Sequence, residues 1–390
     1  MDRSYLRGIS TNILLLGIVS FLNDLSSEMI MPILPMFITA LGGTGLIVGL
    51  VGGLRDSISS ILKVLFGYWS DKTGKRKAFV YSGYLSSSVF KLLLAFSRTW
   101  QHVVVIAGLE RVGKGLRSAP RDAIIAESMP ENAGRGFGIH RALDTSGAIG
   151  GSILVFLLFW FLGFGFSTVI LVAAFIAFLS VVPLHFVREE NKKPLDITLK
   201  LGLRSLPKPL KLFILISGIF AMANFSYMFF ILRSQEIFAG RMSIGMPILL
   251  YLLFNVFYAA LAVPSGVLSD RVGRKRIIVA GYMLFSLTSL GFAFFSSLPA
   301  FILLFALYGS SYALIDGNQR AFVADMSTKE LKATALGTFH TTTGLMVLPA
   351  SLIAGLLWQT TGPMTTFIYG AVAGIIPVLL FVAFRNHFRD

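Results

Sequence analysis

Two carboxylates lie four residues apart in the first apolar run of this 390-residue chain. Asp24 and Glu28 would share one face of a helix, because residues i and i+4 align. At the helical rise of 1.5 Å per residue, Asp24 would lie about 18 Å along a helix that begins near residue 12. Burial disfavours the charged form of a carboxylate and a nearby arginine favours it, so such a group can bind and release a proton. The chemistry predicted here is reversible protonation, and the alternative is a static ion pair between helices.

Other ionisable residues interrupt later apolar runs, mostly in the N-terminal half of the chain. An ionisable group at membrane depth is costly unless it is paired or wetted, so each is a candidate functional residue. Arg111 lies about ten residues from one end of its apolar run, and Asp144 lies in the next run. The residues predicted to couple protons are Asp24, Glu28, Arg111 and Asp144.

The predicted substrate contacts combine these charged residues with neutral polar residues of the C-terminal half. Each neutral residue could equally form an interhelical hydrogen bond, worth about 0.6 kcal/mol on average in a membrane protein. The predicted contacts are Asn23, Asp24, Arg55, Lys91, Arg111, Asn224, Tyr227, Asn255, Tyr312 and Asp316.

The elements that carry these residues are predicted to be membrane-spanning helices. The chain is 55% hydrophobic and 14% charged, whereas an ordinary soluble domain is about 25% charged. An apolar run of roughly 20 residues spans a bilayer, and a β-barrel would show alternation instead. The apolar runs are 12–41, 45–69, 78–97, 101–126, 137–163 and 166–187, then 210–235, 243–268, 277–296, 299–324, 333–361 and 363–385.

A polar loop between apolar runs occurs twice. Gly67–Lys77 reads GYWSDKTGKRK, and Gly266–Arg276 reads GVLSDRVGRKR. At the same offset, Arg121 matches Arg320. The duplication predicts two pseudo-symmetric six-helix bundles, residues 1–187 and 210–390, joined by a polar linker at 188–209. The fold class is therefore an all-α polytopic membrane protein with twelve transmembrane helices.

Basic residues predict the orientation in the membrane. The net charge is +15, and lysine and arginine accumulate in cytoplasmic loops. The N-terminus, both repeated loops, the linker and the C-terminal tail carry most of them. We therefore expect both termini in the cytoplasm, in the inner (plasma) membrane, and no nucleic-acid partner. The first run is too long for the apolar region of a signal peptide and is expected to stay as a helix.

The repeated loop resembles the loop between helices two and three of the major facilitator superfamily, whose pattern is Gly-x-x-x-Asp-[Arg/Lys]-x-Gly-[Arg/Lys]-[Arg/Lys]-[Arg/Lys]. The resemblance covers the whole chain and implies a secondary transporter with alternating access around a site near the bilayer midplane. The loops and the inner ends of the helices beside them are expected to form the gate. The predicted gate residues are Gly67, Asp71, Arg76, Arg117, Arg121, Gly266, Asp270, Arg274 and Arg320.

Two further motifs resemble those of proton-coupled members. Arg111-x-x-Lys114-Gly115 resembles the helix-four pattern Arg-x-x-Gln-Gly, with Lys114 in the place of glutamine. Gly138-x8-Gly147-x3-Gly151 follows the helix-five spacing of antiporters, with Ser152 in the place of proline. These resemblances imply proton antiport, although glycines at that spacing also serve close helix packing.

The leading interpretation is proton-coupled export of a small molecule by a monomer that needs no cofactor. One alternative is uptake or exchange of an organic anion or phosphate ester through a basic cavity of the N-terminal half. A lower-ranked alternative is ferroportin-like export of a divalent metal, with Asn23 and Asp24 as oxygen ligands, although no cluster has the spacing of a metal site. An enzyme is not expected, because the chain shows no catalytic triad, no metal motif and no soluble domain of useful size. ATP is not expected to drive transport, because the chain has no nucleotide-binding loop.

Overall fold

The computed structural model describes residues 10–189, 206–328, 331–384 and 387, and these residues form helices with no strand among them. By packing, the chain divides into two compact units. The first unit contains Met1–Met31 and Ile61–Thr198, and the second contains Pro32–Ser60 and Leu199–Asp390. This division is based on packing. The predicted boundaries at 187 and 210 are based on the duplicated sequence instead, so the two six-helix halves stay a prediction.

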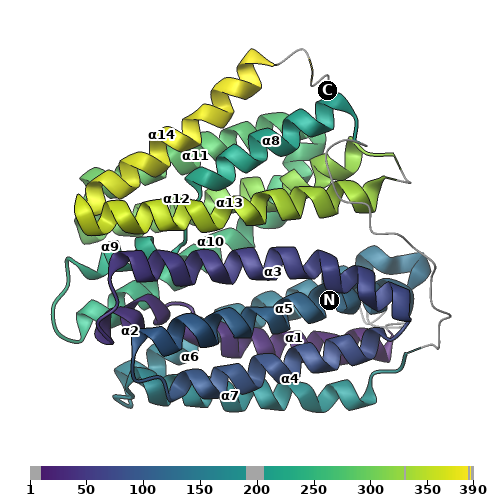
Figure 1. Cartoon of the computed structure of the whole chain (residues 1–390), viewed down its shortest axis with the longest axis horizontal. Helices are drawn as coiled ribbons and strands as arrows, with labels where there is room; N and C mark the ends of the chain where they lie inside the picture. Colours follow the sequence, from purple (N-terminus) through teal and green to yellow (C-terminus); the bar gives the residue numbers. More distant parts are fainter. Residues whose placement is uncertain (1–9, 190–205, 329–330, 385–386, 388–390) are drawn as a thin grey trace. The chain divides into compact units, whose positions relative to one another are not determined.

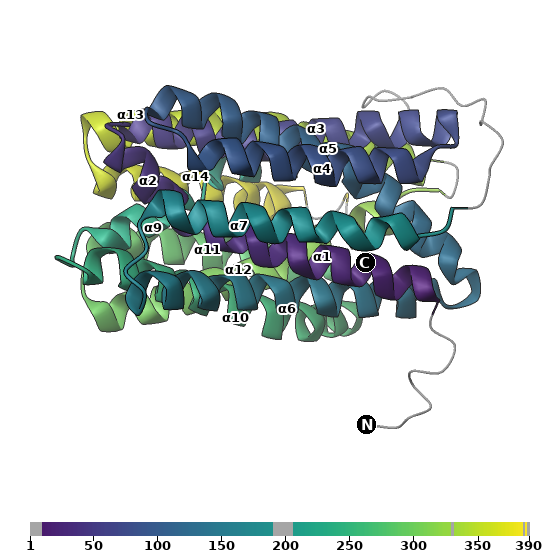
Figure 2. The same cartoon turned by 90° about the horizontal axis from the view of Figure 1, so that it is seen from below.

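The first unit consists of long helices that run side by side (Figure 1), with α1 between α6 and α7 (Figure 2). Its helices are α1 Thr11–Ile30, α4 Arg76–Ala95, α5 Trp100–Ser128, α6 Ala133–Trp160 and α7 Phe166–Val181, with short 3-10 turns η2 Pro130–Asn132 and η3 Val182–Phe186. The helix α3 Gly45–Thr73 begins in the second unit and ends in the first. A hydrophobic cluster around Leu16, Val80, Tyr84 and Ile125 joins α1, α4 and α5 at one end.

The second unit contains the remaining helices. They are α2 Leu34–Ala40, α8 Lys208–Ala223, α9 Met228–Gln235, α10 Met242–Val272, α11 Arg274–Phe294, α12 Leu298–Asp325, α13 Lys332–Thr360 and α14 Pro363–Ala383. Its core is aromatic: Phe230 stacks on Tyr308 at 4.1 Å and meets Phe292 edge-on at 5.0 Å. Such aromatic pairs stabilise the fold beyond what the burial of their apolar surface contributes.

Length and composition agree with the predicted membrane class. Within the described residues, eleven helical segments are long and apolar enough to cross a membrane, with α1 and α2, α7 and η3, and α8 and α9 each taken as one segment. The helix α5 has 29 residues but carries more charged side chains than the others. Large apolar residues on several helices are exposed, among them Val263 at 74% and Phe161 at 71%. An exposed apolar surface on helices of this length is suited to contact with lipid acyl chains.

Two predicted continuous segments are broken in the structure. The run 12–41 forms α1 and α2, separated at Met31–Ile33, where Pro32 lacks the backbone donor that would continue the hydrogen bonding of α1. Pro35 lies in the first turn of α2, where a missing donor is tolerated. The run 210–235 forms α8 and α9, separated at Asn224–Tyr227 without any proline. Non-helical backbone at membrane depth needs other hydrogen-bond partners. At this second break the Ser226 amide donates to Ser351 Oγ at 3.1 Å.

Candidate functional site

The ionisable residues of α1 and α6 meet in the first unit. The carboxyl groups of Asp24 and Asp144 are close enough to share a hydrogen bond. Asn23 Nδ2 donates to Asp24 Oδ1 at 3.1 Å, and Arg141 Nη1 donates to Asp144 Oδ2 at 3.0 Å. Two carboxylates at such a distance repel each other unless a proton lies between them. We call this arrangement the carboxyl pair.

Glycines of α6 allow the close approach that forms the carboxyl pair. A Cβ atom at Gly147 would clash with the backbone carbonyl of Phe21, and one at Gly151 would clash with that of Leu25. Asp144 precedes Gly147 by one helical turn, and Asp24 follows Phe21 by the same distance along α1. The predicted helix-five glycines therefore have a physical role here, except that Gly138 faces open space.

Basic side chains of α5 lie near enough to Asp24 to act on its charge. Lys114 and Arg117 act on it electrostatically. Lys114 is exposed although it lies in the middle of α5. Arg117 is only 3% exposed, donates from Nη1 to Ser87 Oγ at 2.7 Å, and lies 4.4 Å over the Tyr84 ring. Asp24 therefore interacts with one acidic neighbour and with two cations.

Lys91 is buried deep inside the first unit, at 1% exposure. Its Nζ donates to Ser26 Oγ at 3.0 Å, to Ser27 Oγ at 2.9 Å and to the Asn23 carbonyl at 3.4 Å. These three acceptors lie on α1 beside Asp24. Lys91 therefore holds the α1 segment of the carboxyl pair and is almost completely buried in this conformation.

The remaining proton-coupling candidates lie on α1 and α5. Arg111 Nε pairs with Glu110 Oε2 at 3.2 Å, and Arg111 Nη2 contacts Met31 Sδ at 3.3 Å, so Arg111 reaches the break after α1. Both Glu110 and Arg111 are 5% exposed. Glu28 packs beside Gly151, where an added Cβ atom would lie 3.0 Å from the Glu28 Cβ.

The two repeated loops make the same set of ion pairs. Arg76 binds Asp71 at 2.6 Å and also binds Glu127 at the end of α5. Arg274 binds Asp270 at 3.1 Å and also binds Asp325 at the end of α12. The acids at the helix ends were not predicted from the loop motif, because they lie about fifty residues further along the chain.

The other predicted gate residues lie near these loops. Arg121 binds the adjacent Asp122 at 2.9 Å and donates to Ser20 Oγ at 3.1 Å. Arg320 binds Asp316 at 2.6 Å. Gly67 faces Ala119 of α5, where an added Cβ atom would lie 3.0 Å away, whereas Gly266 faces open space.

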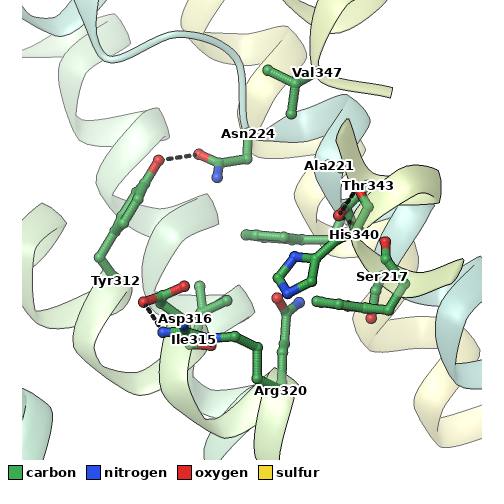
Figure 3. A pocket seen from close by; sticks show the side chains of 13 residues that line it. Ser217, Ala221, Asn224, Tyr312, Ile315, Asp316, Arg320, His340, Thr343 and Val347 are labelled. Atoms are coloured by element: carbon green, nitrogen blue, oxygen red, sulfur yellow. Dashed lines mark hydrogen bonds and ion pairs between the residues drawn. The ribbon is translucent and has the colours of Figure 1, made fainter. Parts of the chain in front are cut away.

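A cavity of about 160 Å³ lies within the second unit (Figure 3). Tyr312 OH donates to Asn224 Oδ1 at 3.0 Å, and Tyr258 OH donates to Asp316 Oδ2 at 2.8 Å. The cavity is lined by α8, α12 and α13, and by the broken segment after α8. The lining residues are Ser217, Phe220, Ala221, Asn224, Tyr312, Ile315, Asp316, Gln319, Arg320, Phe339, His340, Thr343 and Val347.

This cavity contains only some of the predicted substrate contacts. Asn224, Tyr312 and Asp316 line it, whereas Tyr227, Asn255 and Arg55 are not among its lining residues. Tyr227 meets the Tyr251 ring at 5.6 Å, Asn255 is half-buried on α10, and Arg55 is 5% exposed on α3. Gln319 and His340 were not predicted as substrate contacts, although a polar residue in an apolar run is the signal that selected their neighbours.

Comparison with known proteins extends over the whole chain. The Major Facilitator Superfamily matches residues 16–249 and 213–389. An uncharacterized MFS-type transporter of Methanocaldococcus jannaschii is 57% identical over 381 residues, covering 96% of this chain and 95% of that protein. The multidrug resistance protein MdtH of Aeromonas hydrophila is 26% identical over 304 residues, covering 75% of this chain and 74% of MdtH.

Solved structures show the same fold. The nucleoside transporter NupG has a TM-score of 0.78 at 17% identity, with 97% of this chain and 100% of that chain covered. A POT family transporter in complex with 5-aminolevulinic acid has a TM-score of 0.79 at 12% identity, with 98% of each chain covered. The repeated loops, the helical architecture and these similarities agree, and the chain therefore belongs to the Major Facilitator Superfamily, as a membrane transporter rather than an enzyme.

Proposed function

We propose that this transporter exports a small molecule in exchange for protons by alternating access, and that Asp24 and Asp144 together carry the proton. The observation that carries the proposal is the carboxyl pair, because two acidic groups share one seam between α1 and α6. Export is supported by similarity to proteins named multidrug resistance protein MdtH and MdtG.

The neighbours of Asp24 interact with it differently in its protonated and in its charged form. With a proton bound, Asp24 and Asp144 are held together by a hydrogen bond. Without it, they repel each other, and Lys114 and Arg117 attract the charged Asp24. A proton can therefore shift the balance between two positions of α1 relative to α6, which is the differential interaction that a conformational switch requires.

Arg111 and Glu28 have supporting roles in this proposal. Arg111 contacts Met31 at the break after α1, so a movement of α1 changes its surroundings. Glu28 lies one turn beyond Asp24 and packs against Gly151 of α6. It would extend the same seam toward the end of α1. The inner gate would use the ion pairs of Arg76 and Arg274.

The positive-inside rule supports the proposed topology, with both termini, the linker and the repeated loops in the cytoplasm of a cell with this protein in its plasma membrane. The predicted halves, 1–187 and 210–390, would move relative to each other during transport. The linker residues 190–205 lie outside the described residues. The transporter would act as a monomer.

Exchange of an organic anion is the second candidate, and one observation favours it. Lys114 is exposed at the middle of α5, with Arg111 and Arg117 one turn away on either side. Lys114→Gln should then abolish anion binding while it spares neutral compounds. Metal export gains no support, because no three histidine or acidic side chains gather in the described part of the chain as a metal site would need.

The test combines two readouts on wild type, Asp24→Asn and Asp144→Asn. Infrared difference spectra between acidic and alkaline pH detect a protonated carboxyl group in the absence of substrate. Pyranine trapped in proteoliposomes reports proton movement when a panel of neutral amides, organic cations and organic anions is added. We expect the wild type to show a carboxyl signal that both variants lose, and at least one compound to move protons only in the wild type. Proton movement that survives Asp24→Asn would refute the proposal.

A further inference from the structure

We propose that the cavity of the second unit binds an uncharged, flat group that both donates and accepts hydrogen bonds, such as a carboxamide on an aromatic ring. The inference rests on the proposed transport function and names the class of substrate for it. It follows from how two amide side chains of the cavity wall are held, from the shape of the wall, and from the balance of its charges.

The first amide offers a donor. Asn224 ends α8, where the chain leaves the helix at φ −86° and ψ 67°. Tyr312 OH donates to Asn224 Oδ1 at 3.0 Å, which fixes which side of the amide group faces the tyrosine. Figure 3 shows the Asn224 nitrogen directed away from Tyr312, into the cavity. Asn224 therefore presents an oriented N–H donor to a ligand.

The second amide offers an acceptor. Gln319 lines the same cavity one turn along α12 from Asp316, and its Nε2 donates to Tyr282 OH at 2.5 Å. Within the described part of the chain, no donor is bonded to Gln319 Oε1. An amide has one carbonyl acceptor and two N–H donors. With its nitrogen turned to Tyr282, Gln319 keeps its carbonyl oxygen as an acceptor for a ligand. Tyr312 thus orients the donor amide of Asn224, and Tyr282 orients the acceptor amide of Gln319.

The walls of the cavity favour a flat group. Phe220 stacks on Tyr282, with ring centroids 3.9 Å apart and planes at 10°. Phe339 also lines the cavity. The volume of about 160 Å³ is close to that of an apolar protein cavity of about 150 Å³ that binds benzene. The cavity therefore has room for one aromatic ring.

The charges that line the cavity are already paired. Asp316 is bound by Arg320 at 2.6 Å and accepts a hydrogen bond from Tyr258 at 2.8 Å. Burial of an ion is costly without a partner of opposite charge. An ionic ligand would compete with the Asp316–Arg320 pair for these two side chains and would lose part of its own hydration. An uncharged group with a donor and an acceptor makes the available hydrogen bonds without that cost.

Four compounds built on one ring test the inference by equilibrium binding to the purified full-length chain. Benzamide carries a donor and an acceptor, N,N-dimethylbenzamide lacks the donor, benzoate is an anion, and benzyltrimethylammonium is a cation. We expect benzamide to bind at least about fivefold more tightly than the other three, because each mismatch leaves a polar group of the wall without a partner.

A near-isosteric variant tests the donor. Asn224→Asp keeps the acceptor for Tyr312 and removes the N–H group, so benzamide should bind at least about fivefold more weakly. The matched control is Asn132→Asp, the same chemical change at an exposed position outside the cavity, which should leave binding unchanged. If Asn224→Asp does not fold, Tyr312→Phe removes the hydroxyl group that orients the amide, and the preference for benzamide over N,N-dimethylbenzamide should fall.

Three results would overturn the inference: binding of none of the four compounds, equal or tighter binding of a charged compound, or unchanged benzamide binding in Asn224→Asp. The infrared signal of the carboxyl pair needs no ligand. The proton proposal can therefore stand when the substrate class fails, and the substrate class can stand when the carboxyl signal is missing.

Discussion

An alanine at Gly147 should separate α1 from α6 and destabilise the protein. The added Cβ atom would lie 2.9 Å from Phe21 Cα and 3.0 Å from Phe21 C, and still closer to the carbonyl oxygen. These are backbone atoms, so no side chain can rotate away. Overpacking of this kind costs about 1–3 kcal/mol, against a gain in helix propensity of up to about 1 kcal/mol.

Gly150→Ala is the matched control on the same helix. Its Cβ atom would lie 3.6 Å from Leu25 Cδ1, which is ordinary van der Waals contact. Both variants gain the same helix propensity, so the difference between them isolates the clash at about 1–3 kcal/mol. At about 2–4 °C per kcal/mol, the two melting temperatures should differ by several degrees.

The assay is thermal unfolding in nanodiscs, followed by tryptophan fluorescence at one fixed scan rate, since unfolding of such proteins is often irreversible. Gly147→Ala should melt below wild type, and Gly150→Ala should melt at or above it. The infrared signal of the carboxyl pair should also weaken in Gly147→Ala alone. Equal melting temperatures for the two variants would refute the close seam between α1 and α6.

Two other substitutions should differ in the size of their effect on stability. Lys91→Met should lower the free energy of unfolding by about 1–3 kcal/mol, because two serine hydroxyl groups and a carbonyl of α1 lose their buried donor; an unchanged melting temperature would contradict this role. Arg76→Gln should change stability by less than about 1 kcal/mol, because its partners Asp71 and Glu127 are partly exposed. Its effect should instead appear in the transport rate, and a large loss of thermal stability with normal transport would show that these ion pairs are structural.

The all-helical membrane class and the repeated loops could be predicted because they depend on local patterns. An apolar run of about twenty residues or a cluster of basic residues can be recognised within one stretch of sequence, without knowledge of how the helices pack. The broken segments could be predicted only in part. Pro32 and Pro35 are local signals for the first break, but the break at Asn224 depends on Ser351, which is distant in sequence.

The candidate site could be predicted as a set of residues, but not as an arrangement. Asp24 and Asp144 were each predicted to take part in proton coupling, yet their contact depends on the packing of α1 against α6. Lys91 was predicted to contact substrate, which stays a prediction, whereas its burial against Ser26 of α1 could not be predicted. Burial and pairing follow from how helices pack, which the composition of one helix does not reveal.

The most direct test of the central claim is the infrared pH-difference spectrum of wild type, Asp24→Asn, Asp144→Asn and the double variant in lipid. If the two carboxyl groups share one proton, each single variant should remove or shift the same carboxyl band, and the double variant should add nothing further. Two independent bands, each removed by one substitution alone, would contradict a shared proton at the seam between α1 and α6.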